Sequence, residues 1–247
     1  MSRFALAVAI VSLIVGVYPD ATSAASLSEV ILGIGLNTSV SPWRIVQPTS
    51  TVMNVDWPVY VLVIIRDVVN EATATVDRTG PDGKALWTRT IRWRGNFRRG
   101  WGSSFIPLAG TPNEERVGQW KIVVRVDGGA PSEVVLNVTQ AERAVMETLS
   151  AEAQKNPNSF TANYRLGAAA SLFGTDDLAV THLKKAAEIA RTSVYPHMAL
   201  GRHYFKRGMK QQALDEFSFA KGLLMGVEER GLAGWLQQVI EEYMKQL

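Results

Sequence analysis

The feature that most constrains this chain is a set of similar residues that recur 34 positions apart after Gln140. The pairs are Leu166 and Leu200, Gly167 and Gly201, Ala170 and Tyr204, Gly174 and Gly208, Ala179 and Ala213, Leu183 and Phe217, and Ala186 and Ala220. Small side chains let two antiparallel helices approach closely, while Leu183 and Phe217 fill the space between them. Gly174 and Gly208 allow a helix to end. The spacing therefore predicts repeated helix pairs in the C-terminal half.

A 34-residue period with this order of Leu-Gly, Gly, Ala, large apolar residue and Ala resembles the tetratricopeptide repeat. Val145, Leu149 and Pro157 fit a half repeat before the first unit. After the second unit, one helical stripe is apolar, as a capping helix requires. That stripe consists of Leu232, Trp235, Leu236, Val239, Ile240 and Tyr243. The resemblance implies a short α-solenoid over residues 141–247.

Repeats of this family hold peptide segments in a concave groove, so the resemblance also implies a binding surface. By repeat position, the first unit contributes Thr161, Tyr164, Ala168, Ser171 and Leu172, and the second contributes Tyr195, Met198, Arg202, Phe205 and Lys206. Arg202 and Lys206 are four residues apart and share a helix face. With Tyr164, Tyr195, Met198 and Phe205 they suit an acidic, partly apolar partner segment; the alternative is a solvated helix face. The carboxylate clamp of the family needs asparagine where this chain has Ala168 and Arg202.

The preceding residues, 26–140, have the two-residue period of strands. Apolar runs at 60–65, 120–126 and 134–138 are separated by turn signals at 80–83, 110–113 and 127–131. This spacing predicts an antiparallel sandwich of about seven strands. The segment from Gly118 to Gly128 and the strand after it resemble the closing hairpin of immunoglobulin-like domains in bacterial envelope proteins. The expected fold is therefore multidomain, all-β plus all-α: an immunoglobulin-like β-sandwich followed by a tetratricopeptide α-solenoid.

The stretch WTRTIRWRGNFRRGWG, residues 87–102, mixes arginines with aromatic rings. Trp87, Arg89, Ile91 and Trp93 alternate with polar residues, which predicts a half-buried strand whose arginines solvate its outer face. The second interpretation is an anion-binding surface for an acidic wall polymer or a lipid headgroup. Its candidate residues are Arg92, Arg94, Arg98, Arg99 and Trp101.

The N-terminus predicts export. Residues 4–17 form an uncharged apolar run of 14 residues after a basic start, and small residues at 21–25 provide a cleavage site. An uncleaved anchor is the alternative, but about 20 apolar residues are needed to span a bilayer. The expected organisation is a signal peptide at 1–25, a sandwich at 26–140 and a helical domain at 141–247. We expect a periplasmic or secreted protein with no transmembrane segment in the mature chain.

Catalytic and cofactor motifs were sought and none was found. The chain has no cysteine and three histidines, His182, His197 and His203, which we interpret as structural. Gly33-Ile34-Gly35 lacks the rest of a dinucleotide loop, and no Walker-type loop or Gly-x-Ser-x-Gly elbow is present. The net charge of +3 is spread over both halves, which argues against nucleic acid. We expect no enzyme activity, cofactor or metal.

The sequence thus leaves two functional hypotheses. The first is a non-catalytic adaptor or scaffold that binds a protein partner in the cell envelope through the concave helical surface. The second is an envelope protein whose basic aromatic hairpin binds an anionic wall polymer or lipid.

Overall fold

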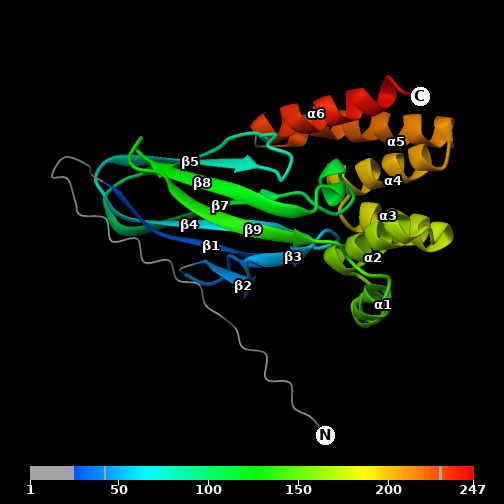
Figure 1. The fold of residues 1–247 in the computed structure, drawn as a ribbon, viewed down its shortest axis with the longest axis horizontal. Helices are drawn as coiled ribbons and strands as arrows, with labels where there is room; N and C mark the ends of the chain where they lie inside the picture. The colour runs from blue at the N-terminus through cyan, green and yellow to red at the C-terminus, as the bar shows by residue number, and fades with distance from the viewer. Residues whose placement is uncertain (1–24, 42, 228–229) are drawn as a thin grey trace, which may run out of the picture.

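The computed structural model describes residues 25–41, 43–227 and 230–247, in which nine β-strands precede six α-helices (Figure 1). The strands are β1 (Ser26–Asn37), β2 (Arg44–Pro48), β3 (Thr51–Met53), β4 (Val59–Val68), β5 (Glu71–Thr79), β6 (Arg89–Arg94), β7 (Phe97–Ile106), β8 (Gly118–Val126) and β9 (Ser132–Thr139). The helices are α1 (Val145–Lys155), α2 (Phe160–Phe173), α3 (Asp176–Ile189), α4 (Val194–Lys206), α5 (Lys210–Leu223) and α6 (Arg230–Met244). Two short 3-10 helices, η1 (Pro112–Glu115) and η2 (Leu224–Gly226), lie between them.

The strands form two sheets. One has the order β2-β1-β4-β7 and the other β3-β9-β8-β5-β6. All pairings are antiparallel except that of β3 with β9, which is parallel. The apolar runs at 60–65, 120–126 and 134–138 lie in β4, β8 and β9, as their period predicted.

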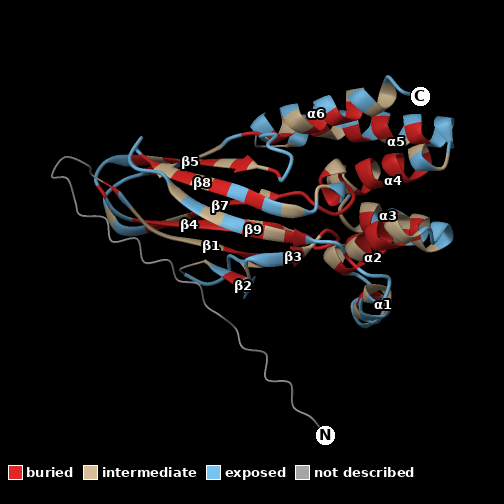
Figure 2. Ribbon diagram, in the orientation of Figure 1, coloured by how far each residue is buried: buried red, intermediate tan, exposed pale blue. Residues whose placement is uncertain are grey.

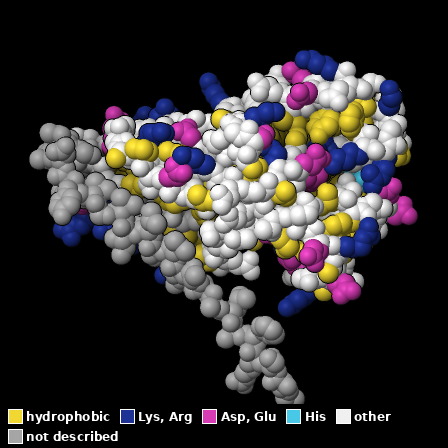
Figure 3. Space-filling model, viewed as in Figure 1, with side chains coloured by type: hydrophobic (Ala, Val, Ile, Leu, Met, Phe, Trp, Pro, Cys, Tyr) yellow, Lys and Arg dark blue, Asp and Glu magenta, His cyan; other side chains and the backbone are white. Residues whose placement is uncertain are grey.

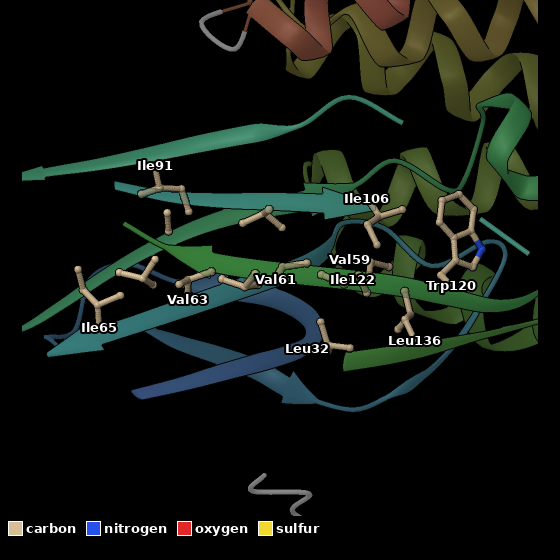
Figure 4. Close-up of a cluster of buried hydrophobic side chains, with 14 of the residues drawn as sticks. Leu32, Val59, Val61, Val63, Ile65, Ile91, Ile106, Trp120, Ile122 and Leu136 are labelled. Carbon is tan, nitrogen blue, oxygen red and sulfur yellow. The ribbon is translucent and has the colours of Figure 1, made fainter. Parts of the chain in front are cut away.

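The interior of the sandwich is formed by alternate residues of each strand, because successive side chains point to opposite faces of a sheet. Every second residue of β4, from Val59 to Ile65, points into the same cluster as Ile91, Ile106, Trp120, Ile122 and Leu136 (Figure 4). Leu62 and Ile64, which alternate with these residues, lie on the outer face, where Ile45 of β2 also packs. A Cβ on Gly33 would lie 2.2 Å from the Gln47 carbonyl oxygen of the neighbouring strand β2, so glycine is required at this close approach.

The helices form the two expected antiparallel pairs, α2 with α3 and α4 with α5. A Cβ on Gly167 would lie 2.7 Å from Leu183, and one on Gly201 would lie 2.7 Å from Phe217. The glycines that recur 34 residues apart therefore lie where the two helices of each pair are in close contact. The apolar stripe of α6 is also buried through Leu232, Leu236, Val239 and Ile240, against α4 and α5.

The sheets and helices share a hydrophobic core. Trp57, Trp87 and Ala109 of the strand half belong to one cluster with residues of α2 to α6. The Trp57 ring lies 5.1 Å from that of Tyr164, and the Trp87 ring 5.4 Å from that of Trp235, between ring centroids. Figure 2 shows buried residues on the helix turns nearest the end of the sandwich. The helices are thus packed against the sheets.

The predicted fold class is therefore wrong. The structure is an α+β arrangement of two sheets followed by helices, and a tetratricopeptide solenoid is not seen. A solenoid leaves its groove open, whereas here the corresponding helix face packs against the sandwich. The strand half also has nine strands in the described residues rather than seven, with a parallel pair at β3. The division into two domains at residue 140 stays a prediction; that residue lies between β9 and α1.

Within the stretch at 87–102, β6 covers Arg89–Arg94, only Gly95 and Asn96 form the turn, and Phe97 already begins β7. Of the expected signal peptide at 1–25, the apolar run at 4–17 and all of the small residues at 21–25 except Ala25 lie outside the described residues. Within the described ranges, no helix is long and apolar enough to cross a bilayer.

Candidate binding surface

The predicted groove is occupied by the protein's own loop between β7 and β8. This loop, residues 107–117, includes η1 and carries two adjacent carboxylates, Glu114 and Glu115. Its Ala109 carbonyl accepts a hydrogen bond from the Tyr164 hydroxyl at 2.6 Å. Thr111 caps η1 by accepting from the Asn113 amide, which fixes the turn that presents the carboxylates. The occupant is acidic and partly apolar, as the groove chemistry predicted, but it belongs to the same chain.

Arg202 and Lys206 bind the two carboxylates of this loop. The Arg202 guanidinium lies 2.9 Å from Glu114 and 3.0 Å from Glu115, and Lys206 Nζ lies 2.8 Å from Glu115. The side chains of Arg202 and Glu114 are only 3% and 6% exposed, so this is a buried ion pair. Burial opposes the charge of Arg202, but Glu114, together with Tyr243 and Glu115, raises its pKa overall.

The electrostatics of Glu115 agree with this geometry. Partial burial acts to raise the pKa of Glu115, but its hydrogen bond and charge interaction with Lys206 lower it overall, helped by Arg202. Glu115 is therefore held in its charged form by the two cations. The cations that were expected to meet a partner already have their counter-charges.

The remaining candidate groove residues also contact the chain itself. Met198 is fully buried, Tyr195 packs against Trp57 with ring centroids 4.4 Å apart, and Phe205 meets Tyr243 edge-on at 5.1 Å. A small pocket beside the ion pair is lined by Gly110, Glu114, Ala168, Ser171, Ala199, Arg202 and Lys206. This surface is therefore not an open groove, and binding of an external partner there stays a prediction.

A serine, a histidine and an aspartate come together beside this pocket. Ser171 Oγ lies 2.9 Å from His203 Nδ1, and Asp176 lies 3.9 Å from His203 Nε2. Asp176 instead accepts a hydrogen bond from Arg207 Nε at 2.8 Å and forms a salt bridge with the same guanidinium at 2.7 Å, and His203 is 1% exposed. This geometry fits a structural hydrogen bond between α2 and α4, as the sequence interpretation of His203 expected. In the described ranges, no three His, Asp or Glu residues are grouped to hold a metal.

The arginines of the hairpin lie at the other end of the sandwich, away from the helices (Figure 1). Arg92 and Arg94 lie on β6, at the edge of the five-stranded sheet, and alternate with the inward-facing Ile91 and Trp93. Arg98 and Arg99 lie on β7, at the edge of the four-stranded sheet. Because a single turn at Gly95 and Asn96 joins β6 to β7, all four lie within a few residues of the same tip.

The structure adds a fifth arginine that the sequence stretch did not contain. Arg66 of β4 pairs directly with Arg99 of β7 in the sheet register. Cross-strand neighbours are about 5 Å apart, so two like charges are placed side by side. Trp101 is different from the arginines, because its half-buried ring packs on the outer apolar cluster with Ile64.

All five arginines, Arg66, Arg92, Arg94, Arg98 and Arg99, are exposed. None of them forms a salt bridge with any residue that the structure describes, although Glu71 is the direct cross-strand partner of Arg94, and Asp67 and Asp127 lie within a few residues of the same tip. On the face of the molecule that Figure 3 shows, basic and acidic side chains are interspersed over the helices. We call these five residues the arginine end.

Two turns hold the arginine end together. The Gly95 amide donates to the Asn70 carbonyl at 2.6 Å, and the Asn70 amide donates to Asn96 Oδ1 at 2.7 Å. These bonds join the β4–β5 turn to the β6–β7 turn, and both of these connections pass between the two sheets. Asn70 has a φ of 68°, a conformation that asparagine adopts more readily than most residues.

Comparisons with known proteins add little to this geometry. No family model matches the chain, and no curated protein matches it. Among solved structures, the C-terminal domain of Wzt aligns with 48% of this chain and 75% of its own length, at 12% identity and a TM-score of 0.32. A likeness at this level supports no conclusion about fold or function.

Proposed function

We propose that this chain is a non-catalytic binding protein of the cell envelope that holds an anionic ligand at its arginine end. The observation that supports this proposal is the contrast between the two basic sites. The cations of the helical face, Arg202 and Lys206, are neutralised by Glu114 and Glu115. The five arginines at the opposite end form no salt bridge with any described residue, and they outnumber the three carboxylates there.

Arginines that lie close together without salt-bridge partners destabilise the fold, because their charges repel one another. Like charges directly opposite each other on paired strands are destabilising, and Arg66 and Arg99 are so placed. A ligand with several negative charges would remove that repulsion and gain bidentate hydrogen bonds from guanidinium groups. Export, which places the protein among wall polymers and lipids, rests on the N-terminal sequence and is part of the proposal.

The test is binding of the chain from Ala25 onward to inorganic polyphosphate, a soluble polyanion, measured by fluorescence titration at low and high salt. Saturable binding that weakens with salt is expected. Replacing Arg98 and Arg99 by glutamine should weaken it, while replacing Lys184 and Arg191, two exposed cations of the helical half, should not. Equal loss from both double variants would mean that net charge alone matters and would refute a site at the arginine end.

A further inference from the structure

The position at which the described chain enters the sandwich coincides with the arginine end. Ser26, the first residue of β1, pairs with Arg66 of β4, and Arg66 pairs with Arg99 of β7. Neighbouring strands are about 4.8 Å apart, so the start of β1 lies within about 10 Å of Arg99. The four-stranded sheet thus brings its first residue and two of the unpaired arginines into one row.

A short distance before Ser26, the sequence contains an apolar run of the type found in export signals and membrane anchors. The uncharged apolar run at 4–17 ends eight residues before Ala25. Eight residues span at most about 29 Å even when fully extended. As long as that run is attached and engages a bilayer, whether as an export signal or as an anchor, the start of β1 and the arginines beside it stay within about 29 Å of the run's last residue.

The composition of the tip suits a bilayer surface. The five arginines outnumber the three carboxylates at this end, Asp67, Glu71 and Asp127. Between the arginines of β4 and β6, the β4–β5 turn exposes Val69, which is 54% accessible and is one of few large apolar side chains that are exposed. Basic residues around an exposed apolar residue combine the two contributions that bind proteins to anionic lipid surfaces: charge attraction and burial of apolar area.

We propose that the ligand of the arginine end is the surface of an anionic phospholipid bilayer, with the guanidinium groups at the phosphates and Val69 at the level of the headgroups. This inference rests on the proposed function, which it narrows to one source of negative charge. Each basic residue near an anionic membrane contributes about a fivefold increase in binding. Loss of two arginines should therefore weaken binding about 25-fold.

The experiment is sedimentation of the chain from Ala25 onward, which contains every described strand and helix, with large vesicles. Vesicles of phosphatidylcholine alone are compared with vesicles that also contain phosphatidylglycerol. We expect binding only to the anionic vesicles, weakened by salt and about 25-fold weaker for Arg98→Gln with Arg99→Gln. Val69→Ser should lower binding without changing its dependence on salt, and Lys184→Gln with Arg191→Gln should leave it unchanged.

The outcomes separate this inference from the proposed function. If the protein binds polyphosphate through Arg98 and Arg99 but does not sediment with anionic vesicles, the bilayer is not the ligand and a soluble or wall-bound polyanion is. If it binds neither, both proposals are refuted. If both double variants lose vesicle binding equally, attraction is general and the arginine end is not the site. Circular dichroism of each variant shows whether the fold is kept.

Discussion

Replacing Arg202 by methionine should markedly destabilise the protein. Methionine keeps most of the volume of the side chain but leaves the Glu114 carboxylate, 6% exposed, without its closest cation. Removing one partner of a buried ion pair costs about 3–5 kcal/mol. Glu114 retains Lys206 Nζ at 3.4 Å and the Gly110 amide at 2.9 Å. We therefore expect the lower part of that range, about 3 kcal/mol.

The companion variants test whether this cost comes from the stranded carboxylate. Glu114→Gln keeps the shape of the side chain and an oxygen for the Gly110 amide, while Arg202 retains Glu115 at 3.0 Å and the Tyr243 hydroxyl at 3.0 Å. Glu114→Gln should therefore cost less, about 1–2 kcal/mol. In the double variant no buried charge is left unpaired, so its loss should be smaller than the sum of the two single losses.

The assay is urea unfolding, in which the free energy of unfolding is extrapolated to zero denaturant. Arg207→Met is the matched control, because its partner Asp176 is 51% exposed and such a pair contributes at most about 1 kcal/mol. A loss below about 1 kcal/mol for Arg202→Met, or strict additivity in the double variant, would refute the reasoning. Either result would mean that the loop carboxylates are solvated rather than clamped.

Three further predictions concern the same junction. Gly110→Ala should lower the free energy of unfolding in urea by about 2–4 kcal/mol, because φ at this residue is +69° and a Cβ would lie 2.3 Å from the Tyr164 hydroxyl. Gly83→Ala is the control: φ is similar, +75°, but the space around it is open, so the loss should be only about 1 kcal/mol. Tyr164→Phe should cost about 1–2 kcal/mol, since it removes the buried hydrogen bond to the Ala109 carbonyl, and no measurable loss would mean that water replaces the hydroxyl. Burial, followed by the charge of Arg207, lowers the pKa of His203 below its usual value of 6.5. Below that pH the unfolded chain therefore binds a proton that the folded chain binds less readily, and the melting temperature should fall as the pH drops below 6.5. His203→Gln should reduce that fall.

The parts of the fold that were predictable depend on local patterns. The β4, β8 and β9 strands follow from β-branched runs between turn signals, and the α2–α3 and α4–α5 pairs follow from glycines placed opposite Leu183 and Phe217. Each of these signals acts within one element or between neighbours in sequence. Such patterns specify elements and their immediate partners.

The errors arose where distant segments meet. Nothing in the repeat pattern indicates that Glu114 would reach Arg202, because the two are joined only by the docking of the helices on the sandwich. The repeat pattern predicted the groove residues but did not reveal that the loop between β7 and β8 packs against them. The Arg66–Arg99 pair was missed for the same reason, since the strand register and not the sequence spacing brings it together.

The joined turns at the arginine end also determine what such a surface is able to recognise. The hydrogen bonds between Asn70 and the Gly95–Asn96 turn fix the backbone, so little backbone entropy remains to be lost on binding. The arginine side chains above it are long, exposed and free of partners among the described residues, and can therefore move independently. A stiff base with mobile charges responds to the density of negative charge rather than to its pattern, and so accommodates phosphates whose spacing changes continually.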